Sequence, residues 1–466
     1  MRLLMKFGGT SVADAAMIRR VTDIIEEYHE GGHELAVVVS AQRGVTDQLI
    51  AIATEIADSR SAATIEPFIQ SLRIRHVSVL SEVAPGYADD MGILIEEQLC
   101  DLDNILNAVH NLRELTPRSL DYIITYGERL NSILVSAAFR ERGIPSLVMD
   151  GCEAGILTTS GHGEAMALPE SDVRIRSRVQ PLLTDTVPVI MGFMGCTGRG
   201  IITTLGRSGS DYSAAIIGSG IEADEIWIWT DVDGIMTSDP RVIPDARVIG
   251  SISYLEVMEL SFFGAKVMHP RSIEPAMKKN IIVRVKNTFN PSHPGTTIVR
   301  GEKHDSRVVK ALTYIDKVAL ITICGAQMIG RPGVAKAIFS ALADAEVNVM
   351  MISQGSSEAN ISLIIDESQL AVATDALSVL VKEGLVREVS SNRDACAVAV
   401  IGAGMAGAKG TGGRIFTALG NGGVNVMMIS QGSSEVNISF VVRQADGPKA
   451  VRILHDEYRL SEEDHA

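Results

Sequence analysis

Positive charge is scarce in this sequence. Its 466 residues include 42 Lys and Arg against 57 Asp and Glu, which gives a formal net charge of −15. Proteins that bind the nucleic-acid backbone usually carry an excess of Lys and Arg, so we expect no nucleic-acid partner. Any anionic ligand must therefore be met by a small local group of cations.

Long apolar runs and paired cysteines are also missing. No stretch of roughly 18 apolar residues occurs, so we expect no membrane span and no membrane partner. The apolar start is too short for a signal peptide before Gly8 and Gly9 intervene. The absence of a CxxC pair predicts reduced, buried thiols in a cytoplasmic protein. The five cysteines are Cys100, Cys152, Cys196, Cys324 and Cys396.

Aromatic residues make up only 4% of the chain, whereas hydrophobic residues make up 46%. This composition excludes a disordered or fibrous protein and predicts a globular core of aliphatic side chains and methionine. At roughly 100–200 residues per domain, the length indicates two to four domains. The 42 glycines suggest tight turns or close approach of a ligand to the backbone.

Short apolar runs alternate with amphipathic stretches over the first 300 residues. Helical patterns such as 13–28, which ends at Gly31 and Gly32, lie between the runs, and 62–111 is mostly helical in pattern. This alternation predicts an α/β domain with an open, mainly parallel sheet between helical layers, over residues 1–305. The expected buried strands are 3–5, 35–39, 187–191, 226–229 and 281–285.

The last third contains an internal repeat. Residues 347–358 recur without change at 424–435, and 24 of 41 positions are identical between 325–365 and 402–442. Each copy has the pattern strand, glycine-rich turn, helix, strand, strand. We therefore expect two small ferredoxin-like βαββαβ modules, at 306–390 and 391–466.

Two glycine-rich loops could bind an anion. Lys6 to Ser11 follows the first strand, where Gly8 and Gly9 would allow backbone N–H groups to approach a phosphate. By spacing alone, a plain tight turn is about as probable. Gly206 to Asp211 forms the second loop, with Ser210 as the expected N-cap of the next helix. Its Arg and Asp could form a structural salt bridge or converge with Lys6 on one ligand.

Residues 402–407 match the GxGxxG pattern of dinucleotide-binding sites. Only about 60 residues follow, which is too few for a dinucleotide domain, and we do not expect NAD binding. Residues 230–241 are a surface loop or a ligand loop at the carboxyl end of a strand. Lys266 stands between apolar neighbours, where either an anionic partner or a snorkelling side chain would account for it.

In this order and spacing, the motifs resemble those of monofunctional aspartate kinases (aspartokinases) in the amino acid kinase superfamily, over nearly the whole chain. The repeats resemble tandem ACT domains, and no homoserine dehydrogenase domain is expected after them. The matching segments are KFGGTS at 6–11, VVVSA at 37–41, Thr46-Asp47, YGERL at 126–130, GRSGSD at 206–211, TDVDG at 230–234, SDPR at 238–241, FGAKVMHP at 263–270 and the repeated ISQGSSE.

The resemblance implies transfer of the ATP γ-phosphoryl group to the β-carboxylate of L-aspartate. A carboxylate with a pKa of about 3.9 is already ionised and needs no general base, so the obstacle is bringing two anions together. Lys6 and Lys266 would hold the phosphates with the N–H groups of Gly8 and Gly9. Asp211 would orient the lysines, and Mg²⁺ would be bound mainly by phosphates and water.

The resemblance also implies roles for the remaining site residues. Arg207 would pair with a substrate carboxylate and Glu128 with the substrate ammonium, while Ser40, Thr46 and Ser210 complete the aspartate pocket. The nucleotide would be held by Thr230, Asp231, Met236 and Arg241, together with the two lysines and the first glycine loop.

The ACT-like repeats imply feedback control of lysine, threonine and methionine biosynthesis by an amino acid, and a homodimer or homotetramer formed through these modules. The residues that are identical in the two repeats are explained equally well by the shared packing of a duplicated module. The effector-binding candidates are Asn348, Ser353, Gln354, Asn425, Ser430 and Gln431.

Two other functions are compatible with parts of the pattern. One is another superfamily member that phosphorylates acetylglutamate, glutamate, carbamate or UMP, although those relatives generally lack the tandem repeat. The other is a non-catalytic amino-acid sensor. Three positions depart from the usual aspartokinase motifs: Ser208 replaces a glycine, Met236 a tyrosine and Asn131 a serine.

Overall fold

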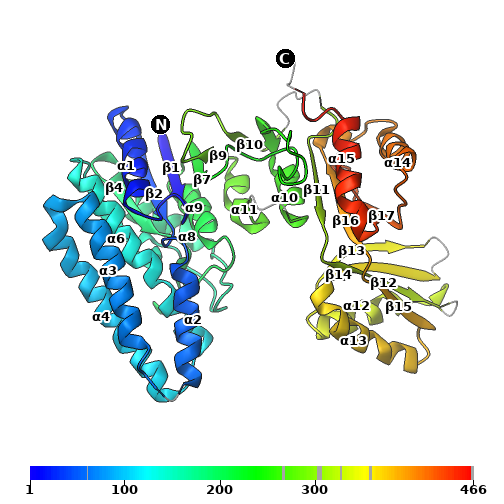
Figure 1. Cartoon of the computed structure of the whole chain (residues 1–466), viewed down its shortest axis with the longest axis horizontal. Helices are drawn as coiled ribbons and strands as arrows, with labels where there is room; N and C mark the ends of the chain where they lie inside the picture. The colour runs from blue at the N-terminus through cyan, green and yellow to red at the C-terminus, as the bar shows by residue number, and fades with distance from the viewer. Residues whose placement is uncertain (60, 265–267, 302–306, 326–327, 356–358, 463–466) are drawn as a thin grey trace. The chain divides into compact units, whose positions relative to one another are not determined.

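The computed structural model describes residues 1–59, 61–264, 268–301, 307–325, 328–355 and 359–462. The chain forms two compact units (Figure 1). The first contains residues 1–235, 250–254 and 268–301, and the second contains 236–249, 255–267 and 302–466. Among the described residues, no helix is both long and apolar enough to span a membrane.

The first unit is built on an eight-stranded sheet with the order β3-β4-β2-β1-β7-β9-β10-β8. β1 lies in the middle, where Met5 is opposite both Val37 and Trp227 in parallel neighbours. The strands from β3 to β9 are parallel, whereas β10 is antiparallel to β9. The predicted mainly parallel sheet is confirmed. The strands are β1 (Arg2–Phe7), β2 (Glu34–Val39), β3 (Ser146–Met149), β4 (Val187–Met191), β7 (Glu225–Thr230), β8 (Ser251–Ser253), β9 (Ile282–Asn287) and β10 (Thr296–Val299).

Helices cover both faces of this sheet, as a mainly parallel sheet requires. On one face, α1, α2, α3, α4 and α6 share a continuous apolar core with β1, β2 and β4 (Figure 1). On the other face α9 lies so close to β7 that a Cβ added at Gly218 would come within 2.5 Å of the Ile226 side chain. The helices of this unit are α1 (Ala15–Glu30), α2 (Val45–Asp58), α3 (Ile65–Val83), α4 (Ala88–Leu112), α5 (Pro117–Ile124), α6 (Tyr126–Glu141), α7 (Gly151–Ala154), α8 (Glu170–Arg178), α9 (Gly209–Gly220) and α11 (Pro270–Lys279). Apart from its first residue, α10 (Tyr254–Phe262) belongs to the second unit.

Local sequence sets the ends of these helices. The Asp14 side chain accepts a hydrogen bond from the Met17 N–H and caps α1, which ends at the predicted Gly31. In α6 nearly every residue is buried, because the helix lies against β3, β4 and neighbouring helices. A short hairpin of β5 (Met194–Cys196) and β6 (Ile202–Thr204) leads into α9.

The second unit contains two modules with four-stranded sheets. The first module has the order β13-β14-β12-β15 with two helices, which is the complete βαββαβ pattern predicted from the repeat. Its elements are β12 (Val318–Cys324), α12 (Val334–Asp344), β13 (Val349–Gln354), β14 (Asn360–Asp366), α13 (Leu370–Lys382) and β15 (Glu388–Asn392).

The sheet of the second module includes one strand, β11, that precedes the first module in the sequence. Its sheet has the order β11-β16-β18-β17, and Ala311 of β11 lies opposite Ile401 of β16. The first module is therefore inserted between two neighbouring strands of the second. β11 lies within 306–390, the range that the sequence assigns to the first module, and the boundaries at 305 and 390 stay predictions. The elements are β11 (Ala311–Ile315), β16 (Cys396–Ile401), α14 (Thr411–Asn421), β17 (Met428–Gln431), β18 (Asn437–Val442) and α15 (Gly447–Glu457).

The GxGxxG segment has a packing role in this second module. A Cβ added at Gly402 would lie 2.4 Å from the Val308 carbonyl oxygen, and one at Gly404 would lie 2.6 Å from that of Arg307. Both glycines therefore allow residues 307–308 to pass close to the turn. The N–H of Ala403 donates to Glu256 Oε1 at 2.7 Å.

The prediction of five reduced, buried thiols is wrong. Cys152 and Cys196 form a disulfide, because the fold brings α7 and the end of β5 together with a Cα–Cα distance of 5.2 Å. Of the other three, Cys100 is exposed, Cys324 is half-buried and only Cys396 is buried. The spacing along the sequence could not reveal this pair, since 44 residues separate its members.

The insertion predicts that the first module can be removed. β11 and β16 are antiparallel neighbours with Ile315 opposite Ala397, so a two-residue turn can join them. A chain in which Asn-Gly replaces residues 317–395 should be soluble and unfold cooperatively in a thermal circular-dichroism scan. Adding Leu312→Asp, which places a charge in the core of the second module, should remove the transition assigned to that module. Aggregation of the shortened chain without this substitution would contradict the insertion.

Candidate functional site

A cavity of about 730 Å³ opens in the first unit at the carboxyl ends of β1, β2 and β6. Loops at this edge of a parallel sheet commonly bind ligands. The cavity brings together eight residues that the sequence analysis selected from five separate segments. They are Lys6, Gly9, Ser40, Thr46, Glu128, Arg207, Ser210 and Asp211.

An ion pair joins the two glycine-rich loops. Lys6 Nζ lies 2.6 Å from Asp211 Oδ1, and the two side chains are only 11% and 12% exposed. Lys6 comes from the end of β1, and Asp211 lies in the first turn of α9. The two glycine-rich loops therefore meet at the Lys6–Asp211 contact. Their convergence on one ligand stays a prediction.

The first loop needs its glycine for close packing. A Cβ added at Gly9 would lie 2.9 Å from the Ala41 carbonyl oxygen, so a side chain there would push the loop away from β2. The N–H of Gly8 donates to the Trp229 carbonyl at 3.3 Å, which fixes the loop beside the end of β7.

The predicted N-cap at Ser210 is wrong. α9 begins at Gly209, and Ser208 is the residue before it, with φ 55° and no side-chain capping bond. The helix starts earlier because Gly206, with φ 77°, and Ser208 both turn in the left-handed region, and the N–H of Gly209 bonds the Gly206 carbonyl. Serine at 208 thus occupies a conformation that glycine adopts without strain.

Glu128 is buried at the start of α6, and it faces the cavity. Its Oε1 accepts a hydrogen bond from the Ala41 N–H at 3.1 Å, while its buried Oε2 has no hydrogen-bond partner among the described residues. Burial raises the pKa of the Glu128 carboxyl to about 8, although the bonds from backbone N–H groups and the positive charge of Lys6 oppose this shift. A buried carboxyl with a raised pKa and an unpartnered oxygen in a cavity is a candidate for a functional residue.

The start of α6, which carries Glu128, packs tightly against the segment that follows β2. A Cβ added at Gly127 would lie 2.6 Å from the Ala41 Cβ, so only glycine lets α6 approach β2 this closely. Asn131, which departs from the usual motif, donates from Nδ2 to the Ser40 carbonyl at 2.7 Å.

Of the residues selected for nucleotide binding, Lys6 and Gly9 line the cavity, whereas Gly8, Thr230, Asp231, Met236 and Arg241 do not. Thr230 and Asp231 lie at the carboxyl end of β7, where Thr230 Oγ1 donates to Asp231 Oδ1 at 3.2 Å. Met236 packs against the apolar core of the second unit. In the same unit, Arg241 is exposed and bonds the Asp239 carboxylate. Lys266 lies outside the described residues.

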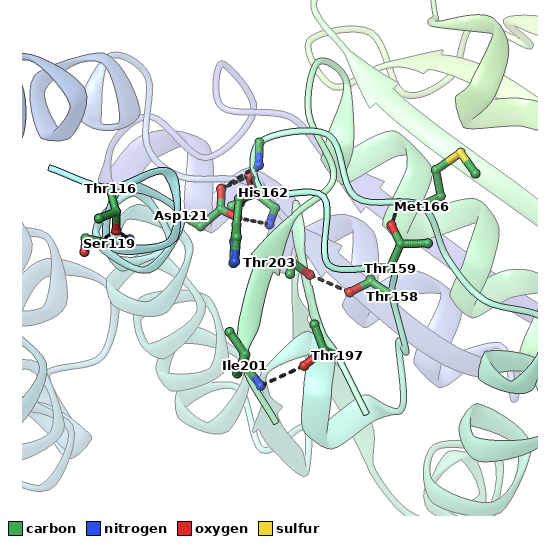
Figure 2. A network of polar contacts seen from close by, with 12 residues as sticks. Thr116, Ser119, Asp121, Thr158, Thr159, His162, Met166, Thr197, Ile201 and Thr203 are labelled. Atoms are coloured by element: carbon green, nitrogen blue, oxygen red, sulfur yellow. Dashed lines mark hydrogen bonds and ion pairs between the residues drawn. The ribbon is translucent and has the colours of Figure 1, made fainter. Parts of the chain in front are cut away.

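The cavity lining also contains residues that the sequence analysis missed, and two of them are Phe193 and Asp121. Phe193 follows β4 with φ 69°, and its place directly after a predicted strand could have signalled it. Asp121 lies in α5 and is buried, with no motif around it to mark it in the sequence. Figure 2 shows Asp121 and His162 pointing toward one another, with Asp121 Oδ2 2.6 Å from His162 Nδ1.

A second cavity, of about 350 Å³, lies in the first module of the second unit, beside the start of α12. Gln354 lines it together with Arg331. The other effector-binding candidates lie on or near the edge strands β13 and β17. Between these strands, Ser430 Oγ donates to the Ile352 carbonyl at 3.3 Å. The remaining candidates are Asn348, Ser353, Asn425 and Gln431.

Comparison with known families assigns both units. Residues 1–287 match the amino acid kinase family, and residues 321–379 and 398–458 match the ACT domain. The chain belongs to the amino acid kinase family. This family and the tandem ACT domains agree with the resemblance found in the sequence.

The similar proteins are aspartokinases. The bifunctional aspartokinase/homoserine dehydrogenase 1 of Zea mays is 34% identical over 98% of this chain, which spans only 50% of that protein. Aspartokinase 1 of Arabidopsis thaliana is 32% identical, and 98% of this chain and 80% of that protein are covered. The chain thus spans about half the length of the first curated relatives that it matches.

Solved structures give the same result. Escherichia coli aspartokinase III in complex with aspartate and ADP, in its R state, has a TM-score of 0.81 and 28% identity, over 98% of this chain and 99% of that one. The same enzyme with lysine and aspartate, in its T state, has a TM-score of 0.78 with the same identity and coverage. The predicted kinase fold followed by two ACT modules is confirmed.

The buried Glu128 predicts how stability depends on pH. Its pKa is about 8 in the folded protein, while an exposed Glu has a pKa of about 4.3. Between these values the unfolded chain has lost a proton that the folded protein keeps, so stability should fall as the pH rises from about 5 to 8. At about 1.4 kcal/mol per pKa unit, the loss should reach a few kcal/mol.

Urea unfolding of the ligand-free protein at a series of pH values measures this effect, with Glu128→Gln as the matched variant. The substitution should remove most of the decline between pH 5 and 8. Parallel profiles for the two proteins would contradict a raised pKa at Glu128.

Proposed function

We propose that this protein is an aspartate kinase, which transfers the γ-phosphoryl group of ATP to the β-carboxylate of L-aspartate and forms 4-phospho-L-aspartate. This is the first step in the biosynthesis of lysine, threonine and methionine. The observation that carries the proposal is the cavity that combines the Lys6–Asp211 pair with Arg207 and the buried Glu128. The similarity to aspartokinase III, solved with aspartate and ADP, supports it.

The charges of the cavity suit an amino acid with a second carboxylate. The buried Glu128 would accept the substrate ammonium, which would supply a partner for its free oxygen. Arg207 is exposed at the cavity and makes no ion pair among the described residues, so it is available for a substrate carboxylate. Ser40, Thr46 and Ser210 would complete this pocket with hydroxyl groups.

The chemistry requires positive charge more than a base. The β-carboxylate of aspartate is ionised at neutral pH, so it can attack the γ-phosphorus without losing a proton. Lys6 and Lys266 would hold the phosphates, with the N–H group of Gly9, which lines the cavity. The predicted phosphate contact of the Gly8 N–H is not kept, because that group donates to the Trp229 carbonyl. Asp211, at 2.6 Å from Lys6, would keep that ammonium in position and would not act as a base.

The nucleotide and its metal ion complete the proposal. Thr230 and Asp231, at the carboxyl end of β7, are assigned to ATP by their motif, as are Met236 and Arg241. Among the described residues there is no group of three or more acidic, His or Cys side chains that could form a dedicated metal site. Mg²⁺ would then be bound mainly by phosphate and water oxygens, where it neutralises negative charge.

The ACT modules would provide feedback control. An amino acid effector would bind near the edge strands β13 and β17, at residues among Asn348, Ser353, Gln354, Asn425, Ser430 and Gln431. The protein would be a cytoplasmic homodimer or homotetramer formed through these modules. The lysine complex of aspartokinase III supports an amino acid as the effector class.

Removing the Lys6 charge tests the phosphate role. Lys6→Met should lower kcat with aspartate and ATP by at least a hundredfold, because the γ-phosphoryl group loses its clamp while the side-chain volume is kept. Lys279→Met, at a partly exposed surface position, is the matched control and should retain activity. Activity is measured as hydroxamate formation with a panel of acids. Near-normal turnover by Lys6→Met, or a preference for another acid, would overturn the assignment.

Binding of aspartate should also release a proton. At pH 7 the Glu128 carboxyl, with a pKa of about 8, is mostly protonated, and an ammonium group beside it would favour the ionised form. Calorimetric titration with aspartate in two buffers of different ionisation enthalpy should give a release approaching one proton. Glu128→Gln should abolish the release. Binding by the wild type without proton release would contradict the role of Glu128.

A further inference from the structure

Asp121 is a buried carboxylate that the proposed chemistry does not use. Its side chain is only 2% exposed, and a carboxylate in such a place needs several donors. It lies on α5 at the wall of the cavity, and all of its partners come from two other segments.

The first segment is the loop around His162. His162 Nδ1 lies 2.6 Å from Asp121 Oδ2, and the N–H of Gly163 donates to Oδ1 at 3.0 Å and to Oδ2 at 3.2 Å. Figure 2 shows this loop folded over the Asp121 carboxylate. Asp121 thus holds the loop by both a side chain and the backbone.

The second segment is the end of β6. Thr204 donates from its hydroxyl to Asp121 Oδ1 at 2.5 Å and from its N–H to Oδ2 at 3.2 Å. The Ala165 N–H donates to the Thr204 carbonyl at 2.9 Å, so the two segments are also joined directly. Asp121 therefore fixes the point from which the chain enters the second glycine-rich loop.

That loop carries Arg207, and little else restrains its side chain. Arg207 is flanked by Gly206 and Ser208, both in the left-handed region, and makes no ion pair among the described residues. A Cβ added at Gly206 would lie 3.0 Å from the Gly163 carbonyl oxygen, so the His162 loop packs directly against this turn. The backbone from which the Arg207 side chain projects is therefore next to the segments that Asp121 anchors.

We propose that Asp121 is a positioning residue: through Thr204 and the His162 loop it holds Arg207 in the orientation that binds the carboxylate of the amino-acid substrate. The proposal rests on the proposed aspartate kinase function. Asp121 acts on the amino-acid side of the cavity, so its loss should weaken binding of aspartate and leave the binding of ATP nearly unchanged.

β6 offers a matched pair of variants. Thr203 and Thr204 are adjacent, both fully buried, and each donates or shares one hydroxyl hydrogen bond. Successive strand residues face opposite sides, so Thr203 bonds Thr158 (Figure 2) while Thr204 bonds Asp121. Thr203→Val and Thr204→Val therefore remove similar bonds, and only the second should affect the substrate.

The experiment measures KM for aspartate, KM for ATP and kcat in the full-length protein, with thermal unfolding of each variant. Thr204→Val and Asp121→Asn should raise KM for aspartate at least tenfold and change KM for ATP less than twofold. Thr203→Val should leave both values near those of the wild type, and Thr204→Ser, which keeps the hydroxyl, should restore KM for aspartate.

The outcomes separate this inference from the function on which it rests. A wild-type protein without activity on aspartate would refute the proposed function. An active wild type in which Thr204→Val and Thr203→Val behave alike, or in which both KM values rise together, would overturn the positioning role. If Thr204→Val fails to fold, the comparison of Asp121→Asn with the wild type decides between the same two results.

Discussion

The ion pair between Lys6 and Asp211 is the interaction on which the organisation of the site depends. It joins the end of the central strand to the first turn of α9, two segments that lie far apart in the sequence. The net charge of −15 makes a cation at this place valuable, and the shielding of both side chains from water strengthens its field. Around this pair lie the backbone of the first glycine loop, the buried Glu128 carboxyl at the start of α6 and the Arg207 guanidinium, and the proposed function uses them to bring two anions together.

Much of this arrangement could be predicted from the sequence. The parallel sheet follows from buried apolar runs such as 187–191, which coincides with β4. The motifs predict Lys6, Glu128, Arg207 and Asp211 as site residues. The fold brings the start of α6 and the loop before α9 to the carboxyl end of β1, where Lys6 lies. Their roles rest on the resemblance, since a motif identifies residue types but not the partners that the folded chain gives them.

Other features depend on contacts between distant segments, which no local pattern records. Asp121 is a single acidic residue in a short helix, and its importance comes from two segments more than 40 positions away. The Cys152–Cys196 disulfide and the strand that β11 contributes to the second module have the same origin. The early start of α9 was missed for a different reason. Ser208 adopts a left-handed conformation, which a glycine at this position would have predicted and a serine does not.

The place of β11 also has a consequence for synthesis of the chain. This strand leaves the ribosome before the whole first ACT module and before β16, which is its only neighbour among the strands that the structure describes. Until β16 is made, both edges of β11 are unpaired, and an unpaired strand edge can pair with a wrong partner. The first module contains all of its own strands and can fold during this interval. Its folding draws the ends of β11 and β16 together and so reduces the entropy lost in closing a long flexible loop. The inserted ACT module would then assist the folding of the module that encloses it.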